Sequence, residues 1–402
     1  MPSTHIIKTN LPINQKIRIK IDEFIKKTTS NQYTKIEKFL KNELSIDAIC
    51  DQDIIAGFDH DWSNMEGNAD ILCRPLNKEQ CSILLYICNN LLIPVTISAG
   101  KTNLTGSATP MGGMIISIIR MNRSDSILVN NSKKTVSSSV GVYLEDLRNK
   151  VLEKSNNKLF FPVDPTSRKE AMVGGTISCN ASGFIPGPKG AMRYWVKEIE
   201  FILPSGECIN IKKGEYISKD GIFIIKGNKT SYEIFVPKYP RPKIKNASGP
   251  FSSPEGKIDL IDLIIGSEGI FGMITSCVLK LEKKPTDFIE LFIRLKNEDE
   301  AFKFYHYMHN ILDEDMGKLS AFEYFGENCL NYMVNKEQLF TDGCDVAIYM
   351  QIPVIKNLSD DIEKWYNIIS DSGIINKENQ IISLNEPQNW KTFFEARHSI
   401  PA

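Results

Sequence analysis

Three glycine-bearing stretches constrain this chain more than any other feature of its sequence. They are residues 94–106 (PVTISAGKTNLTG), 174–183 (GGTISCNASG) and 266–272 (GSEGIFG). Each combines small residues with hydroxyl or polar side chains beside an apolar, strand-like run. Such loops let backbone N–H groups approach an anion, because no Cβ stands in the way. Three of them predict a large phosphate-bearing ligand that extends across the fold.

The two commonest phosphate loops do not account for these stretches. Gly100, Lys101 and Thr102 match the end of a Walker loop, but that loop needs a further glycine where this chain has Val95. A G-x-G-x-x-G between a strand and a helix, as in Rossmann nicotinamide sites, is also missing from the sequence. The sequence therefore argues against ATP binding and against nicotinamide binding by these routes.

Length and charge set further limits. A chain of 402 residues predicts two domains, and a net charge of −1 gives no general attraction to nucleic acid or to an anionic membrane. The sequence contains neither a signal-peptide pattern nor an apolar run long enough for an integral membrane segment. Nine cysteines without a C-x-x-C pair predict small buried side chains in a reducing compartment and no metal site. We expect a cytoplasmic protein.

Periodicity predicts the order of the elements. Residues 1–60 are expected to form a helical preface. Residues 70–75 and 93–97 read as strands around a helix over 77–90 that Asn77 caps, and strands are also expected at 114–119, 196–203 and 273–281. The pattern changes near 283, beyond which strands at 289–295 and 346–352 alternate with helices at 299–312 and 358–369. After the preface, we therefore expect one domain over 61–283 and a separate α+β layer over 284–402.

The order and content of the glycine stretches resemble those of the FAD-binding domain in the vanillyl-alcohol oxidase, or PCMH-type, superfamily. Residues 94–106 and the later Arg120 resemble its pyrophosphate loop, Asp164 and Pro165 with 174–183 resemble its second flavin segment, and 262–275 resemble its third. The set is similar to the FAD-linked dehydrogenases of D-lactate, glycolate and D-2-hydroxyglutarate. This resemblance implies an α+β fold with a two-subdomain PCMH-type FAD-binding domain, followed by an incomplete α+β cap domain.

The resemblance and the loop chemistry together nominate a set of cofactor-binding residues. They are Ser98, Ala99, Gly100, Lys101, Thr102, Asn103, Leu104, Gly106, Pro165, Gly174, Gly175, Asn180, Ser182, Gly183, Gly266, Ser267, Glu268, Gly269, Gly272 and Ile274. Many relatives attach the flavin covalently through a histidine in the first loop. Lys101 and Asn103 occupy that loop here, so we expect FAD to be held without a covalent bond.

The implied reaction is dehydrogenation of a D-2-hydroxy acid by hydride transfer to flavin N5. Arg397 matches the family arginine that meets the substrate carboxylate, and its alternative reading is a surface helix arginine. His306 and His309 are spaced by one helical turn, but their tyrosine and methionine neighbours favour an aromatic helix, and His60 reads as a surface residue. The histidine-rich motif that carries the catalytic base in relatives has no counterpart in this sequence.

Three interpretations of activity remain open at this point. The chain is an FAD-dependent dehydrogenase that passes electrons to a quinone or an electron-transfer protein, with peripheral membrane attachment left open. Alternatively, it is a flavin-binding subunit or fragment of a split enzyme, whose partner chain supplies the missing segment. The third interpretation is a non-catalytic FAD-binding relic.

Overall fold

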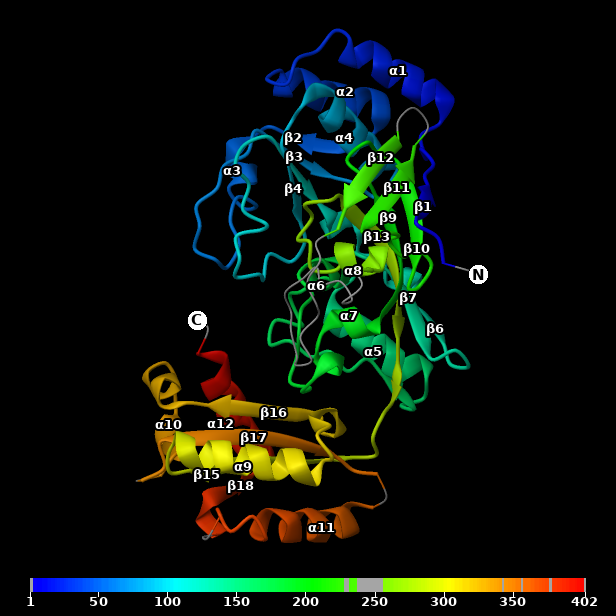
Figure 1. Cartoon of the computed structure of the whole chain (residues 1–402). Coiled ribbons are helices and arrows are strands. Elements are labelled where there is room, and N and C mark those ends of the chain that lie inside the picture. Colours follow the sequence, from blue (N-terminus) through cyan, green and yellow to red (C-terminus); the bar gives the residue numbers. More distant parts are fainter. Residues whose placement is uncertain are drawn as a thin grey trace. The chain divides into compact units, whose positions relative to one another are not determined.

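The computed structural model describes residues 3–227, 231–236, 256–341, 343–355, 357–375 and 378–400 (Figure 1). The chain forms two compact units. Unit 1 contains Met1–Phe161, Ser167–Ala181 and Ala191–Glu282, and unit 2 contains Pro162–Thr166, Ser182–Gly190 and Lys283–Ala402. No helix in the described part is long and apolar enough to cross a membrane.

The first sheet of unit 1 carries the strand that leads into the first glycine stretch. Its order is β2-β3-β5-β4, with bounds β2 (Asp47–Ile49), β3 (Ile71–Arg74), β5 (Met114–Ser117) and β4 (Val95–Ser98). Strands β3, β5 and β4 are parallel, and α4 (Lys78–Leu91) connects β3 to β4. The Asn77 side chain accepts a hydrogen bond from the backbone N–H of Gln80, which confirms the predicted helix cap. Because parallel strands end at one edge of a sheet, the polar ends of β4 and β5 lie together.

The second sheet of unit 1 is antiparallel and five-stranded. Its order is β10-β9-β13-β7-β6, with bounds β10 (Cys208–Lys212), β9 (Val196–Ile202), β13 (Met273–Lys280), β7 (Thr135–Ser139) and β6 (Leu128–Asn130). The helices of this region are α5 (Leu144–Lys154), α6 (Val173–Ser178), α7 (Met192–Trp195) and α8 (Leu260–Ile264). The second glycine stretch therefore opens in helix α6 instead of following a strand, and the run before the third is helix α8.

The beginning of the chain is largely helical, as its periodicity predicted. Helices α1 (Gln15–Ile25) and α2 (Tyr33–Leu44) bury Ile21, Ile36 and Leu40, and the rings of Phe24 and Phe39 stack with centroids 3.8 Å apart. A short helix α3 (Gln52–Ile55) follows. The first strand, β1 (Ile6–Lys8), joins β11 (Ile222–Lys226) and β12 (Ser231–Phe235) in a three-stranded sheet. The predicted helical preface thus also contributes two strands, β1 and β2, to sheets of unit 1.

Unit 2 contains a β-α-β-β-α-β arrangement of the ferredoxin-like kind. It runs through β15 (Phe288–Leu295), α9 (Glu298–Ile311), β16 (Ala321–Phe325), β17 (Val346–Pro353), α11 (Leu358–Ser370) and β18 (Ile381–Ser383), and the sheet order is β16-β17-β15-β18. Both strands and both helices predicted beyond residue 283 are confirmed. The aromatic-rich stretch 322–325, for which the sequence predicted no element, forms edge strand β16.

The sheet of unit 2 has an apolar core on each face. Phe304 of α9 and Trp365 of α11 pack with Ile293 and Ile348 on one face. Phe393 of α12 (Pro387–His398) packs with buried aromatic side chains on the other. The remaining short elements are α10 (Lys336–Leu339), β8 (Leu159–Phe160), β14 (Glu282–Lys283) and 3₁₀ turns at Ile118–Met121, Ser124–Ser126, Pro188–Gly190, Met316–Lys318, Glu327–Asn331 and Glu378–Gln380.

Candidate functional site

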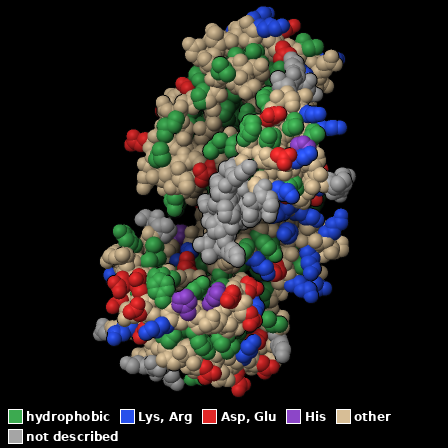
Figure 2. All heavy atoms as spheres, viewed as in Figure 1, with side chains coloured by type: hydrophobic (Ala, Val, Ile, Leu, Met, Phe, Trp, Pro, Cys, Tyr) green, Lys and Arg blue, Asp and Glu red, His purple; other side chains and the backbone are tan. Residues whose placement is uncertain are grey.

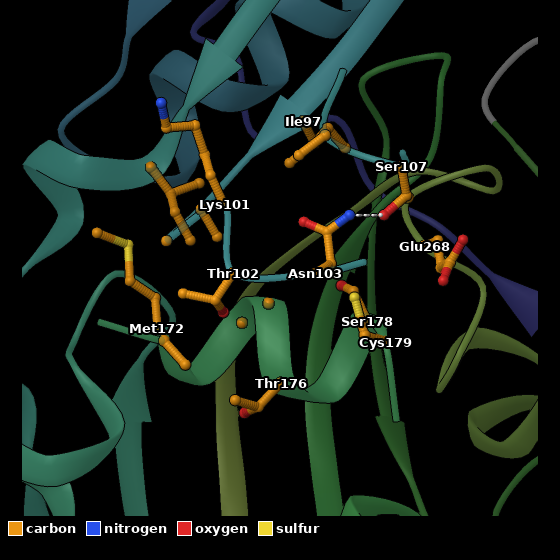
Figure 3. A pocket seen from close by; sticks show the side chains of 18 of the residues that line it. Ile97, Lys101, Thr102, Asn103, Ser107, Met172, Thr176, Ser178, Cys179 and Glu268 are labelled. Atoms are coloured by element: carbon orange, nitrogen blue, oxygen red, sulfur yellow. Dashed lines mark hydrogen bonds between the residues drawn. The ribbon is translucent and has the colours of Figure 1, made fainter. Parts of the chain in front are cut away.

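The three glycine stretches converge on one pocket in unit 1 (Figure 3). The first stretch and its surroundings contribute Ile97, Ala99, Gly100, Lys101, Thr102, Asn103, Ser107, Ala108 and Ile118. Helix α6 and its flanks contribute Ser167, Ala171, Met172, Gly174, Gly175, Thr176, Ser178, Cys179 and Ala181, and the third stretch contributes Glu268, Gly269, Gly272, Met273 and Ile274. Segments about 170 residues apart in sequence therefore share one cavity.

Eleven of the residues nominated from sequence line this pocket, and nine do not. The eleven are Ala99, Gly100, Lys101, Thr102, Asn103, Gly174, Gly175, Glu268, Gly269, Gly272 and Ile274. Ser98, Leu104, Gly106, Asn180, Gly266 and Ser267 belong to unit 1 but are not among the lining residues, and Pro165, Ser182 and Gly183 belong to unit 2. The side chain of Asn180 instead accepts a hydrogen bond from the backbone N–H of Arg193, at 2.9 Å.

Sequence reasoning missed the apolar part of the lining. Ile97, Ile118, Ala171, Met172 and Met273 carry no polar signal, and strand ends and helix flanks brought them to the pocket. Ser107, Thr176, Ser178 and Cys179 lie in or directly beside the glycine stretches, so a search for hydroxyl and thiol groups there could have found them.

Close backbone approach explains two of the glycines. A Cβ built on Gly100 would lie 2.2 Å from the backbone oxygen of Glu170, which any side chain would have to displace. A Cβ built on Gly175 would lie 3.1 Å from the Cβ of Ala99, so the first loop and helix α6 approach closely here. Gly100 thus permits the contact of the first stretch with the segment before helix α6, and Gly175 permits the contact between the first two stretches.

Hydrogen bonds connect the third stretch to the other two. The backbone N–H of Glu268 donates to the oxygen of Ser178 at 2.9 Å, and that of Gly266 donates to the oxygen of Ile177 at 3.2 Å. The hydroxyl of Thr105 donates to the carboxylate of Glu268 at 3.1 Å. Direct hydrogen bonds therefore fix the walls of the pocket to one another.

Asp61 holds the first loop in place from outside the glycine stretches. Its Oδ2 accepts from the Asn103 side-chain amide at 2.6 Å and from the Ala108 backbone N–H at 3.1 Å, and its Oδ1 accepts from the Ser63 backbone N–H at 2.9 Å. The same amide of Asn103 donates to the hydroxyl of Ser107 at 3.0 Å (Figure 3). Burial disfavours the Asp61 carboxylate, but the hydrogen bonds from Ser63, Ala108 and Asn103 outweigh burial and lower its pKa.

Two buried hydroxyls at the carboxyl ends of β4 and β5 have no hydrogen-bond partner among the residues that the structure describes. Ser98 and Ser117 are register partners on the parallel strands, and both are fully buried. An unsatisfied buried hydroxyl costs about 1–3 kcal/mol, so a structure rarely retains one without a use for it. Each of these serines directly precedes a pocket-lining residue, Ala99 or Ile118. The two serines lie one residue behind the lining, and the glycine cradle itself fits a polar, phosphate-bearing group such as FAD.

Little cationic charge lines this pocket. Lys101 is the one lysine or arginine among its described lining residues, and its Nζ donates to the backbone oxygen of Gly57 at 2.5 Å and lies 5.6 Å from the ring centroid of Phe58. Lys101 also has a φ of 57°, a left-handed conformation that few residues adopt. An anion here would be held by backbone N–H and hydroxyl groups more than by a side-chain cation.

Cys179 brings a thiol to the wall of the pocket. Burial, together with the carboxylate of Glu268, raises the pKa of this thiol to about 11. Since the thiolate is the nucleophilic form, the side chain is a neutral wall group near neutral pH.

Arg397 lies in unit 2 and holds a carboxylate of its own chain. Its Nε and one terminal nitrogen donate to the two carboxylate oxygens of Glu323 at 2.7 and 2.8 Å. Its guanidinium also lies 4.3 Å from the ring centroid of Phe184. This geometry is the bidentate fork that suits a carboxylate.

None of the residues that line the described pocket is a histidine. His60 is exposed and contacts the carboxylate of Asp59 at 2.7 Å. His306 and His309 follow Tyr305 on α9, with ring centroids 5.4 and 5.6 Å from that of Tyr305, so the interpretation of an aromatic helix is confirmed.

Comparison with known proteins gives the pocket a context. The FAD binding domain family matches residues 69–212, which include the first two glycine stretches. The chain is 28% identical over 354 residues to D-lactate dehydrogenase of Anaerostipes hadrus, covering 85% of this chain and 64% of that protein. It is 24% identical to the mitochondrial D-2-hydroxyglutarate dehydrogenase of Danio rerio, covering 80% of this chain and 53% of that protein. The chain thus spans less than two thirds of the length of either relative.

Solved structures share the fold. An alkyldihydroxyacetonephosphate synthase superposes with a TM-score of 0.62 at 15% identity, covering 93% of this chain and 64% of that one. The 4-ethylphenol oxidase of Gulosibacter chungangensis superposes with a TM-score of 0.60 at 17% identity, covering 97% of this chain and 70% of that one. The expected α+β fold with a PCMH-type FAD-binding domain is confirmed. Residues 69–212 match the FAD binding domain family, and the chain shares the fold of these solved structures.

Proposed function

We propose that this chain is an FAD-dependent oxidoreductase that dehydrogenates a D-2-hydroxy acid. The observation that carries the proposal is the convergence of three glycine stretches on one pocket, two of them inside the FAD binding domain. The choice of substrate class is supported by relatives named as D-lactate and D-2-hydroxyglutarate dehydrogenases. Bound FAD supplies the hydride acceptor, and the protein supplies binding and orientation.

The residues of unit 1 would hold the cofactor without a covalent bond. Backbone N–H groups from Ala99 to Asn103 are the donors that we assign to the pyrophosphate, with the hydroxyls of Thr102 and Ser107 beside them. Asp61 would keep this loop in its binding conformation through Asn103 and Ala108. Asn103 and a neutral Cys179 thiol offer no ready nucleophile for attachment of the flavin.

In unit 2, we assign the substrate carboxylate to Arg397. Its guanidinium already binds a carboxylate in bidentate fashion, so a 2-hydroxy acid would replace Glu323 as its partner. We propose a quinone or an electron-transfer protein as the electron acceptor, and a cytoplasmic location that includes work at a membrane surface.

A second candidate is a flavin-binding subunit whose catalytic base comes from a partner chain. It is favoured by the absence of histidine from the described pocket lining. In this case, FAD would bind and remain oxidised in the presence of substrate until the partner is added.

One set of measurements separates these candidates. The purified protein is incubated with FAD and desalted, and its flavin absorbance is recorded before and after anaerobic addition of D-lactate, D-2-hydroxyglutarate or glycolate, with L-lactate as the stereochemical control. Bleaching by a D-acid supports the dehydrogenase, and acid precipitation should release all the flavin. A flavin that no acid bleaches until a second chain is added supports the subunit. No flavin binding would refute both.

A further inference from the structure

A second pocket lies in unit 2, between helix α9 and edge strand β16, and none of the residues discussed for flavin or substrate lines it. Its volume is about 270 Å³. Ala301 and Ile348 are buried, at 5% and 1% exposure, and give it an apolar base. The other lining residues are four aromatic side chains and one carboxylate, namely Phe302, Tyr305, Phe322, Tyr324 and Glu298.

The periodicity of the two elements puts these rings together. On α9, Glu298, Ala301, Phe302 and Tyr305 recur at spacings of three and four residues, which is one face of a helix. On β16, Phe322 and Tyr324 are two residues apart and so project from the same face of the sheet. The ring centroids of Tyr305 and Phe322 lie 6.1 Å apart, so the helix and the strand share one aromatic wall.

These rings are unusually exposed for large aromatic side chains. Phe302 is 63% exposed, Tyr324 is 44% exposed and Tyr305 is 37% exposed. Leaving an apolar side chain in water forgoes about 1.5–3 kcal/mol of burial, so a cluster of exposed rings commonly marks a binding surface.

The charge beside the rings is negative. The hydroxyl of Tyr324 donates to the Glu298 carboxylate at 3.0 Å, which connects β16 to the first turn of α9. Burial and the carboxylates of Glu298 and Glu327 raise the pKa of Tyr324 to about 12, so the phenol stays neutral. Figure 2 shows acidic side chains beside hydrophobic ones where α9 begins. An occupant must therefore suit apolar ring faces and a carboxylate at the same time.

We propose that this pocket binds a methylated ammonium group, such as the head of a quaternary amine. Aromatic ring faces attract cations through their quadrupole, and methyl groups on the nitrogen match the apolar walls. Glu298 supplies the countercharge at the rim, and Tyr324 orients it. A neutral ligand of the same shape would use the walls but not the charge. This site is independent of the proposed flavin chemistry.

The test is titration of the full chain with choline, followed by calorimetry and by the NMR shift of the choline methyl protons. The comparison ligand is 3,3-dimethylbutan-1-ol, which has the same shape and no charge. We expect choline to bind saturably, with its methyl signals shifted upfield by the rings. Its neutral analogue should bind about tenfold more weakly or worse. Equal affinity for the two ligands, or no saturable choline binding, would overturn the proposal.

Variants assign the binding to these residues. Glu298→Gln removes the countercharge, and Tyr305→Leu removes an exposed ring; each should weaken choline binding about tenfold. Tyr366→Leu changes an exposed tyrosine on α11 outside the pocket and should leave binding unchanged. Circular dichroism establishes that all three fold. Choline binding that is insensitive to both pocket variants counts against the site, and so does self-association of the chain that Tyr305→Leu abolishes, since that result identifies a second copy as the occupant.

Discussion

The guanidinium of Arg397 donates hydrogen bonds to both carboxylate oxygens of Glu323 and lies 4.3 Å from the ring centroid of Phe184. The proposed substrate carries the same functional group as Glu323. The two carboxylates would therefore compete for the guanidinium of Arg397, and Glu323 would lower the affinity of Arg397 for the substrate.

This competition gives a prediction with opposite signs for the two partners. Glu323→Gln should lower the KM for a D-2-hydroxy acid severalfold, because an amide binds the fork more weakly than a carboxylate. Arg397→Lys should raise KM by about tenfold or more, because lysine cannot form the bidentate pair. Steady-state dye reduction measures both, or the shift of the flavin spectrum on adding the 2-keto acid if turnover is slow.

The control for this pair is Lys391→Gln, which removes an exposed ion pair with Glu395 on the same helix, α12. It should leave KM unchanged. If Glu323→Gln and Arg397→Lys lower the melting temperature and leave KM unaltered, the pair is structural only.

The sequence predicted the elements around the flavin pocket better than its inner surface. The cap at Asn77 and the apolar runs of β3, β4, β9 and β13 are local signals, and all are confirmed. The sequence did not predict helix α6, because the two glycines at its start are poor helix formers. The helical conformation there is set by the packing around it.

Long-range contacts account for the other omissions. Asp61 lies 42 residues before Asn103, which it holds, and it stands beside His60, which was predicted to be a surface residue. Likewise, the pairing of Arg397 with Glu323 joins residues 74 positions apart. Neither contact leaves a spacing or a motif in a single sequence.

Asp61 gives the second prediction. Asp61→Ala should weaken FAD binding by about tenfold to a hundredfold, because the first loop loses hydrogen bonds worth about 1 kcal/mol each and must be ordered by the ligand instead. Flavin fluorescence quenching measures the affinity. Asp59→Asn is the neighbouring control, since Asp59 contacts only the exposed His60 among the bonds described for its side chain, and it should change the affinity less than twofold.

The lowered pKa of Asp61 adds a pH dependence. A carboxyl whose pKa is lower in the folded protein stabilises that state above its ordinary pKa, and the contribution is lost as pH falls through the lowered value. FAD affinity should therefore be flat from neutral pH down to about pH 4 and decline below it. A decline that begins near pH 6 would point to another group.

The orphaned hydroxyls give a third prediction, in which stability and affinity move in opposite directions. Ser98→Ala and Ser117→Ala should leave the melting temperature of the flavin-free protein equal or higher, because each removes an unsatisfied buried group. Both should weaken FAD binding several-fold if the ligand satisfies these hydroxyls. Ser155→Ala is the matched control, because buried Ser155 bonds the backbone of Leu159 at 3.0 Å, and its loss should lower the melting temperature. Unchanged FAD affinity in both variants would exclude these hydroxyls from the site.

The last prediction concerns Glu290, a half-buried carboxyl in unit 2. Oε1 of Glu290 accepts from the Tyr349 hydroxyl at 3.1 Å and from the Gln351 amide at 2.5 Å. Burial raises the pKa of Glu290, even though these hydrogen bonds oppose the shift. The folded protein therefore binds a proton more tightly than the unfolded chain does, and stability should decrease as pH rises from the ordinary carboxyl pKa through the raised value.

Glu290→Gln keeps an oxygen that can accept both hydrogen bonds and carries no charge. It should raise the melting temperature at pH 7 by one to a few degrees and remove this part of the pH dependence, whereas Glu337→Gln, at an exposed position on α10, should do neither. Thermal melts of the three proteins between pH 4 and pH 8 measure the effect, and parallel pH curves for wild type and Glu290→Gln would show that Glu290 is not the titrating group.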